Sequence, residues 1–306
     1  MGAFHIMSTS TTCYTLLKPR LAKLTRSLGH LKQGELASVH PTRVAARRLR
    51  ELLPVLHLDP DSAKKMNSRL KKIVRRLGKL RDAEVALALI DRLVESEKAV
   101  RHALPKVRDS LRERQKKVRL KDAIAKSEAD GRRIVKKLER IQARKKDETP
   151  DAEKKRAVLW VIKARVVRRA LVLRHTVEEA GSVYLPERLH TTRIATRRLR
   201  YAVELLSEVD GAHTSELRVF EGVQEHLGRL HDVQTLIARI RRMQGALVPA
   251  DLKAWQELDT LNVLLENKGR RLHASYMHHR AALLHVCERL AGRAAATTGA
   301  AKRKAS

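Results

Sequence analysis

Residues 40–50 read HPTRVAARRLR, and residues 190–200 read HTTRIATRRLR. Each stretch places one histidine and four arginines among small, polar or apolar residues. A second pair of similar segments, LGKLRDAEVALALI from residue 77 and LGRLHDVQTLIARI from residue 227, has the same offset of 150 residues. A constant offset between two pairs of segments indicates an internal repeat. The chain is therefore predicted to contain one folding unit twice.

A helical projection separates charge from apolar residues in both stretches. With successive residues about 100° apart, one face of the first stretch carries His40, Arg43, Arg47 and Arg50, and the equivalent face of the second carries His190, Arg193, Arg197 and Arg200. The opposite faces carry Ala45, Leu49, Leu52, Leu53 and Leu56, and Ala195, Leu199, Ala202, Val203 and Leu206. Each stretch is predicted to be an amphipathic helix with a basic stripe.

The composition predicts an all-α protein. Strong helix formers dominate, while aromatic residues make up only 3% of the chain, and there are 13 Gly and 8 Pro. Apolar residues recur at helical spacing over about 16–32, 38–57, 62–78, 80–97, 101–144, 152–180, 186–208, 213–227, 229–244 and 251–294.

The segment KKDETPDA, residues 145–152, combines charge, a proline and helix-capping residues, so it is the predicted boundary between the halves. The predicted organisation is a flexible N-terminus, a first helical bundle, a second helical bundle and a disordered basic tail, over residues 1–13, 14–149, 150–294 and 295–306.

The charge of the chain points to a polyanionic partner. With 66 Lys+Arg against 34 Asp+Glu, the formal net charge is +32. Like charges three or four residues apart on a helix cost about 0.2–0.5 kcal/mol per pair, and each stripe holds several such pairs without an acidic residue on its own face. Arginine binds phosphate oxygens in bidentate fashion, which lysine does not. The stripes are therefore interpreted as phosphate-binding surfaces.

Several other kinds of site are not indicated. Cys13 and Cys287 stand far apart and form no CxxC pair, so neither a disulfide framework, a metal site nor a cofactor is expected. The sequence shows no apolar run long enough to span a membrane and no signal peptide, which predicts a cytoplasmic protein.

The pattern H-x-x-R-x-x-x-R-R-x-R, followed about thirty residues later by L-G-x-L-x-D and present twice, resembles the CHAD family, the conserved histidine α-helical domain. The resemblance implies two four-helix bundles around a basic central groove that binds inorganic polyphosphate, and association with polyphosphate granules. The positions that match the motif are His40, Arg43, Arg47, Arg48 and Arg50, and His190, Arg193, Arg197, Arg198 and Arg200.

Further basic residues extend these predictions. Lys79 and Arg229 occupy equivalent positions in the LG-x-L segments, and Arg133, Lys137 and Arg140 follow helical spacing on a third basic stripe, so all five are secondary candidates for polyphosphate binding. The second copy departs from the first where Arg76 and Arg81 are replaced by His226 and His231. Trp160 and Trp255 lie in apolar helical runs and are predicted to be core residues.

Three functions remain open on the sequence. The leading hypothesis is non-enzymatic binding of long-chain polyphosphate, with proteins of polyphosphate granules as further partners. The second is a nucleic-acid-binding, nucleoid-associated protein, although the shortage of aromatic residues and the lack of a known DNA- or RNA-binding motif favour nucleic acid only as a weaker, nonspecific competitor. The third is a phosphatase, or an accessory subunit of a polyphosphate-metabolising enzyme; no ExExK signature of a triphosphate hydrolase is present.

Overall fold

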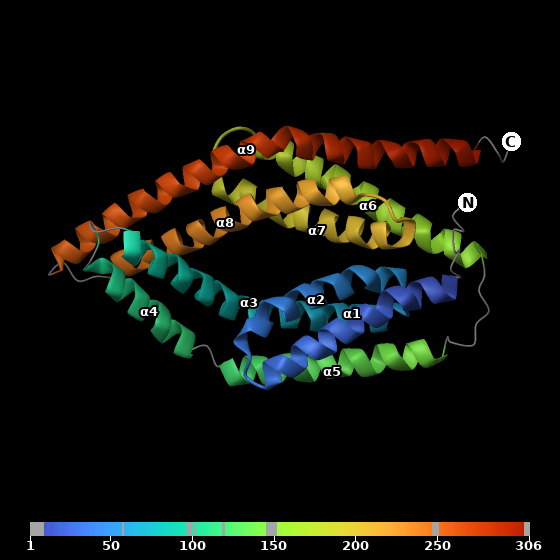
Figure 1. Ribbon diagram of the computed structural model, residues 1–306, viewed down its shortest axis with the longest axis horizontal. Helices are drawn as coiled ribbons and strands as arrows, with labels where there is room; N and C mark the ends of the chain where they lie inside the picture. Colours follow the sequence, from blue (N-terminus) through green and yellow to red (C-terminus); the bar gives the residue numbers. More distant parts are fainter. Residues whose placement is uncertain are drawn as a thin grey trace. The chain divides into compact units, whose positions relative to one another are not determined.

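A computed structural model describes residues 9–56, 58–96, 100, 102–117, 120–144, 152–246 and 251–302. Over these residues the chain is helical with short connections and contains no strand, which confirms the predicted all-α fold (Figure 1). The α-helices are α1 (Thr9–Lys32), α2 (Val39–Leu52), α3 (Pro60–Ser96), α4 (Ala103–Lys117), α5 (Leu120–Arg144), α6 (Ala152–Ala180), α7 (Pro186–Asp210), α8 (Thr214–Gln244) and α9 (Leu252–Lys302). Short 3-10 helices, η1 (Leu36–Ser38) and η2 (Leu53–Val55), precede and follow α2.

The chain divides into two compact units. Unit 1 comprises Met1–Lys79, Arg119–Arg168 and Tyr201–Thr214, and unit 2 comprises Leu80–Val118, Arg169–Arg200 and Ser215–Ser306. Helices α3, α6 and α7 therefore contribute residues to both units. The boundary predicted from the repeat, between residues 149 and 150, lies outside the described residues, and the division into sequence halves stays a prediction.

Unit 1 is built around α1, which packs against α2 and α5 (Figure 1). Leucines recur on the buried face of α1 every seven residues, at positions 17, 24 and 31, and each is at most 1% exposed. The facing helices contribute Leu49 and Leu52 from α2, Leu70, Ile73 and Leu77 from α3, and Ile134 and Leu138 from α5, all fully buried. Burying a side chain of this size stabilises the fold by about 1.5–3 kcal/mol, so this layer sets the rotation of each helix.

Unit 2 has a core of the same kind over α6, α7, α8 and α9. Fully buried residues include Leu173 and Val177 of α6, Leu199 of α7, Phe220 and Val223 of α8, and Tyr276 and Leu283 of α9. A further hydrophobic cluster joins the end of α3 and α4 to the end of α8 and the start of α9, with Ile90, Val107, Leu236 and Leu261 each 0% exposed. The backbone N–H groups of His102 and Ala103, at the start of α4, donate to Glu257 at 2.8 Å.

Several helix boundaries differ from the prediction. The expected break between residues 78 and 80, and the one between residues 227 and 229, are absent because Gly78 and Gly228 lie inside the continuous helices α3 and α8. A glycine inside a helix costs only about 1 kcal/mol relative to alanine, which the packing of a long helix easily offsets. The helix expected over 101–144 is instead α4 and α5, while α2 ends at Leu52 because Pro54 enters η2.

The termini and the tryptophans also differ from the prediction. Helix α1 begins at Thr9, inside the segment expected to be flexible, where neither glycine nor proline interrupts it. Helix α9 continues to Lys302, so residues 295–302 of the expected disordered tail are helical; four of these eight residues are alanine, the strongest helix former. Trp160 is 69% exposed and Trp255 is 45% exposed, because other apolar residues of α6 and α9 already fill the core.

None of the described helices combines the length and apolar character needed to cross a membrane.

Candidate anion-binding sites

The basic stripe of α2 lies in unit 1, and the buried face of α2 determines its direction. Val39, Thr42, Ala46 and Leu49 are 0% exposed, and the Thr42 hydroxyl donates to the Ser38 carbonyl at 2.7 Å. The residues of the stripe occupy the remaining face: His40 is exposed, and Arg43, Arg47 and Arg50 are partly buried. The helix thus presents three arginines in successive turns, as predicted from the sequence.

Helix α3 holds two of these arginines. A Cβ atom added to Gly78 would lie 3.5 Å from Nη2 of Arg43, so the guanidinium packs directly over this glycine. The Arg50 Nε donates to the Asn67 side-chain oxygen at 2.9 Å. Because these contacts reduce the freedom of both side chains, less entropy is lost when an anion binds them.

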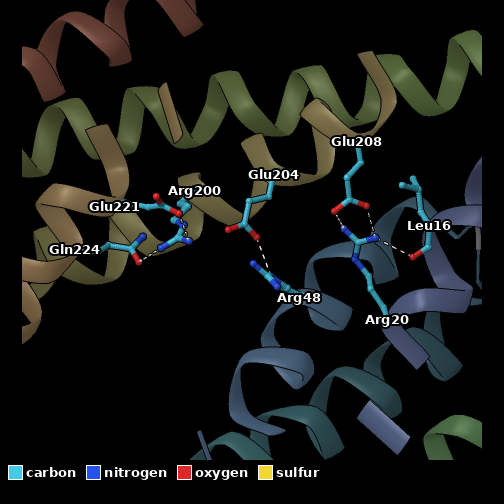
Figure 2. A network of polar contacts seen from close by, with 8 residues as sticks. All are labelled: Leu16, Arg20, Arg48, Arg200, Glu204, Glu208, Glu221 and Gln224. Atoms are coloured by element: carbon cyan, nitrogen blue, oxygen red, sulfur yellow. Dashed lines mark hydrogen bonds and ion pairs between the residues drawn. The ribbon is translucent and has the colours of Figure 1, made fainter. Parts of the chain in front are cut away.

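Arg48 lies on a different side of α2 and already has an anionic partner. Its Nε donates to Glu204 of α7 at 2.9 Å, and the Glu204 side chain is only 12% exposed (Figure 2). Burial lowers the pKa of Arg48, but the hydrogen bond and the charge of Glu204 outweigh burial and raise the pKa above its ordinary value. A phosphate oxygen at Arg48 would have to compete with Glu204, and the predicted role of Arg48 stays a prediction.

Two further ion pairs of unit 1 connect the same helices. Figure 2 shows Arg20 of α1, whose guanidinium donates to both carboxylate oxygens of Glu208 at 2.8 and 2.9 Å and to the Leu16 carbonyl at 2.8 Å. Arg165 of α6 donates to Glu51 of α2 at 3.0 Å. Each of these ion pairs, like the pair between Arg48 and Glu204, joins two helices of unit 1, so together they hold α6 and α7 against α1 and α2.

The basic stripe of α7 lies in unit 2, and a buried face of α7 again determines its direction. Thr192 is fully buried, and its hydroxyl lies 3.1 Å from the Thr176 carbonyl of α6. This leaves His190, Arg193 and Arg197 partly buried on another face of α7, and Arg198 exposed. The carbonyl of Arg198 accepts a hydrogen bond from Arg169 at 2.7 Å.

Arg200, at the end of this stripe, is held by α8. Its guanidinium donates to Glu221 at 2.8 Å and to the side-chain oxygen of Gln224 at 3.2 Å (Figure 2). Glu221 is 58% exposed, so this ion pair is far more accessible to solvent than the pair between Arg48 and Glu204. A surface ion pair of this kind contributes about 0–1 kcal/mol, and an incoming phosphate can displace its carboxylate at little cost.

Two histidines face each other beside the α7 stripe. The Nδ1 atoms of His190 and His231 are 3.2 Å apart, and the ring centroids are 4.7 Å apart. Burial, the charge of Arg193, proximity to His190 and the charge of Arg197 lower the pKa of His231 to about 4. Burial, then Arg193 and Arg197, also lower the pKa of His190, although Glu187 acts in the opposite direction. Both rings are therefore neutral at pH 7, with two arginines close enough to repel any added proton.

A cavity of about 870 Å³ opens next to this histidine pair, within unit 2. It is lined by Tyr184, Pro186, Glu187, His190, His231, Gln234, Thr235, Ile237, Ala238, Arg241, Arg242, Glu266 and Arg270. Of these lining residues, only His190 is a binding candidate on the sequence, because the others are spread over α7, α8, α9 and the segment before α7. The sequence signal for this cavity is that the second copy of the repeat has His231 where the first copy has Arg81.

The secondary candidates are all exposed. Lys79 lies next to the glycine that faces Arg43, whereas Arg229 forms an ion pair with Glu225 one turn earlier in α8, at 2.5 Å. Arg133, Lys137 and Arg140 follow one face of α5, away from the buried side of that helix. Their participation in binding stays a prediction.

The described residues also include a buried cysteine and a second pair of histidines. No group of three or more His, Cys, Asp or Glu residues that could hold a metal ion is found among the described residues. Burial, followed by nearby carboxylates, raises the pKa of the Cys287 thiol to about 12, so this thiol is a poor nucleophile. His226 and His279 stack with ring centroids 4.9 Å apart, a second histidine pair of unit 2.

The fold and the paired arginine motif together define a member of one family of all-α domains. Residues 15–241 match the family model of the CHAD domain, and the chain therefore belongs to the CHAD domain family, as the sequence motif predicted. It is similar in fold to the crystal structure of the CHAD domain from the plant Ricinus communis, with 20% identity and a TM-score of 0.61 over 92% of this chain and 94% of that one. It is also similar to PptA from Streptomyces chartreusis, with 16% identity and a TM-score of 0.64 over 89% of this chain and 99% of that one. No curated protein sequence matches the chain.

Proposed function

We propose that this protein binds long-chain inorganic polyphosphate through the arginine stripes of α2 and α7, without catalysing a reaction. Membership of the CHAD family, which is known for polyphosphate binding, supports the choice of ligand. The observation that carries the proposal is that each unit presents three arginines of one helix along one face, at least one of them braced by a neighbouring helix. The residues proposed to bind are those that match the family motif: His40, Arg43, Arg47, Arg48, Arg50, His190, Arg193, Arg197, Arg198 and Arg200.

The chemistry of the ligand explains why these stripes favour it. Polyphosphate carries a negative charge on every unit and offers only phosphate oxygens, so it needs guanidinium donors and no base-reading groups. Binding of such a polymer releases condensed counterions, and its affinity should fall steeply with salt concentration, as for nucleic acids. Lys79, Arg229, Arg133, Lys137 and Arg140 would add to this attraction as secondary contacts. A basic groove, a cytoplasmic location and association with polyphosphate granules belong to the same proposal.

The test compares two variants that lose the same charge. The stripe variant replaces Arg43, Arg47, Arg193 and Arg197 by alanine. The control variant replaces by alanine four exposed cations outside the two stripes, two in each unit: Lys18, Lys23, Arg218 and Lys253. Binding to polyphosphate of defined length is measured over a salt titration, and circular dichroism checks that helicity is retained.

The stripe variant should bind at least about a thousandfold more weakly, because each hydrogen bond between charged groups contributes about 1.5 kcal/mol or more. The control variant should lose far less. Unchanged affinity of a folded stripe variant would overturn the proposed site. Double-stranded DNA of matched charge is the second ligand: if it binds as tightly as polyphosphate, the protein is a general polyanion or nucleic-acid binder instead.

A further inference from the structure

The cavity of unit 2 has the size and the lining of a site for a small molecule. Its volume of about 870 Å³ lies within the range of about 300–1,000 Å³ that is typical of such sites. All of its walls belong to unit 2: the segment before α7, the first turns of α7, the second half of α8, and the first half of α9. Apart from His190, none of its residues belongs to the proposed polyphosphate stripes.

One wall of the cavity is apolar and contains a fixed aromatic ring. Tyr184 lines the cavity together with Pro186, Ile237 and Ala238. The Tyr184 hydroxyl accepts a hydrogen bond from Gln234 at 3.3 Å, and its ring contacts His273 with centroids 5.4 Å apart. A Cβ atom at position 269 would lie 2.5 Å from this hydroxyl, so a glycine at that position in α9 makes room for it. Inorganic polyphosphate has no apolar part that could pack against a wall of this kind.

Another part of the lining is cationic. Arg242 donates from Nε to the Ala238 carbonyl at 2.9 Å, and Arg270 makes one long hydrogen bond, of 3.5 Å, to Asn267. Within the described part of the chain, neither arginine forms an ion pair with a carboxylate. Both are exposed, and their guanidinium groups are suited to bind phosphate oxygens.

The cavity also contains two carboxylates, which argue against a polymer of phosphate alone. Glu266 forms an ion pair with Arg241, while Glu187 lies at the first turn of α7 and is exposed. A carboxylate repels a phosphate chain, but it accepts hydrogen bonds from sugar hydroxyls and exocyclic amines. The lining therefore suits a ligand with a phosphate end, a hydroxylated or amino-bearing part and a flat apolar ring.

We propose that this cavity binds a nucleoside polyphosphate, with the base against Tyr184 and the phosphates at Arg242 and Arg270. This site shares only His190 with the residues proposed to bind polyphosphate, and the inference does not rest on the proposed function. His190 borders both the cavity and the α7 stripe, so a bound nucleotide would lie next to the residues proposed to hold polyphosphate.

The experiment compares ATP with inorganic tripolyphosphate, which has the same number of phosphates but no nucleoside, by isothermal titration calorimetry on the full chain. ATP should bind at least about tenfold more tightly, because stacking of a base on an aromatic side chain has an effect of this size. Tyr184→Ala should remove this advantage and leave tripolyphosphate binding unchanged, whereas Tyr184→Phe keeps the ring and should keep the advantage. Arg270→Ala should weaken both ligands, and Arg271→Ala, at the neighbouring exposed position, should weaken neither.

Equal affinity for ATP and tripolyphosphate in the unmodified protein would overturn the inference, as would an ATP advantage that survives in Tyr184→Ala. Should Tyr184→Ala fail to fold, Arg270→Ala decides: unchanged ATP binding in that variant also overturns it. Binding of long-chain polyphosphate to the cavity variants keeps the two proposals apart. If Tyr184→Ala loses the ATP advantage but retains polyphosphate binding, the cavity is independent of the stripes.

Discussion

Acid should destabilise this protein through His231, and replacing His231 by glutamine should remove that contribution. Burial and the nearby Arg193 and His190 lower its pKa from 6.5 to about 4 in the folded protein. Between these two values the unfolded chain binds a proton at this residue and the folded chain does not, so stability is lost as the pH falls through this window. At about pH 5 the loss from this single residue amounts to about 2 kcal/mol, since one pKa unit corresponds to about 1.36 kcal/mol.

Urea unfolding at about pH 7.5 and about pH 5 measures this contribution. The unmodified protein should lose about 2 kcal/mol more than His231→Gln between the two pH values. Glutamine retains hydrogen-bonding groups that can face His190, so the substitution removes the titration while keeping a polar partner. The control is His278→Gln, at an exposed position of α9. Equal losses in the unmodified protein and in His231→Gln would refute the reasoning.

Three further predictions follow from side-chain contacts. Glu204→Gln breaks the ion pair with Arg48 of α2, so the free energy of unfolding in urea should fall by about 1–3 kcal/mol. Polyphosphate should bind this variant several-fold more tightly, because Arg48 loses its competing carboxylate. Unchanged affinity would mean that Arg48 does not reach the ligand. Gly131→Ala would place its Cβ atom 2.2 Å from a methyl group of Leu28, so the free energy of unfolding in urea should fall by about 1–3 kcal/mol. Gly29→Ala is the control, because a Cβ atom there has no neighbour within 4 Å and should not lower the free energy of unfolding. Alkylation of Cys287 followed by mass spectrometry should be slow at pH 8 and fast in urea, because the thiol is buried and its pKa lies near 12; fast labelling of the folded protein would contradict this.

The helical class of this protein is predictable from its sequence because helix formation leaves local signals. Apolar residues at helical spacing and strong helix formers are sufficient to predict which segments are helical, although not where every helix begins and ends, and the repeated arginine motif is sufficient to predict the family. The errors arise where packing overrides local signals. Gly78 and Gly228 do not interrupt their helices, and Trp160 is exposed because α6 carries apolar residues on more than one side.

The direction of each stripe follows from residue spacing along a single helix. The angles about the helix axis that separate His190, Arg193 and Arg197 depend only on their spacing in the sequence. Burial of the opposite face of α7 therefore turns all three side chains away from the core together. Only the tertiary structure shows which residues of the two motifs have partners on other helices. Glu204, which pairs with Arg48, is 156 residues away in the chain, and the His190–His231 contact spans 41 residues. Such contacts depend on how helices pack, and spacing along one helix carries no information about the residues that another helix brings beside it.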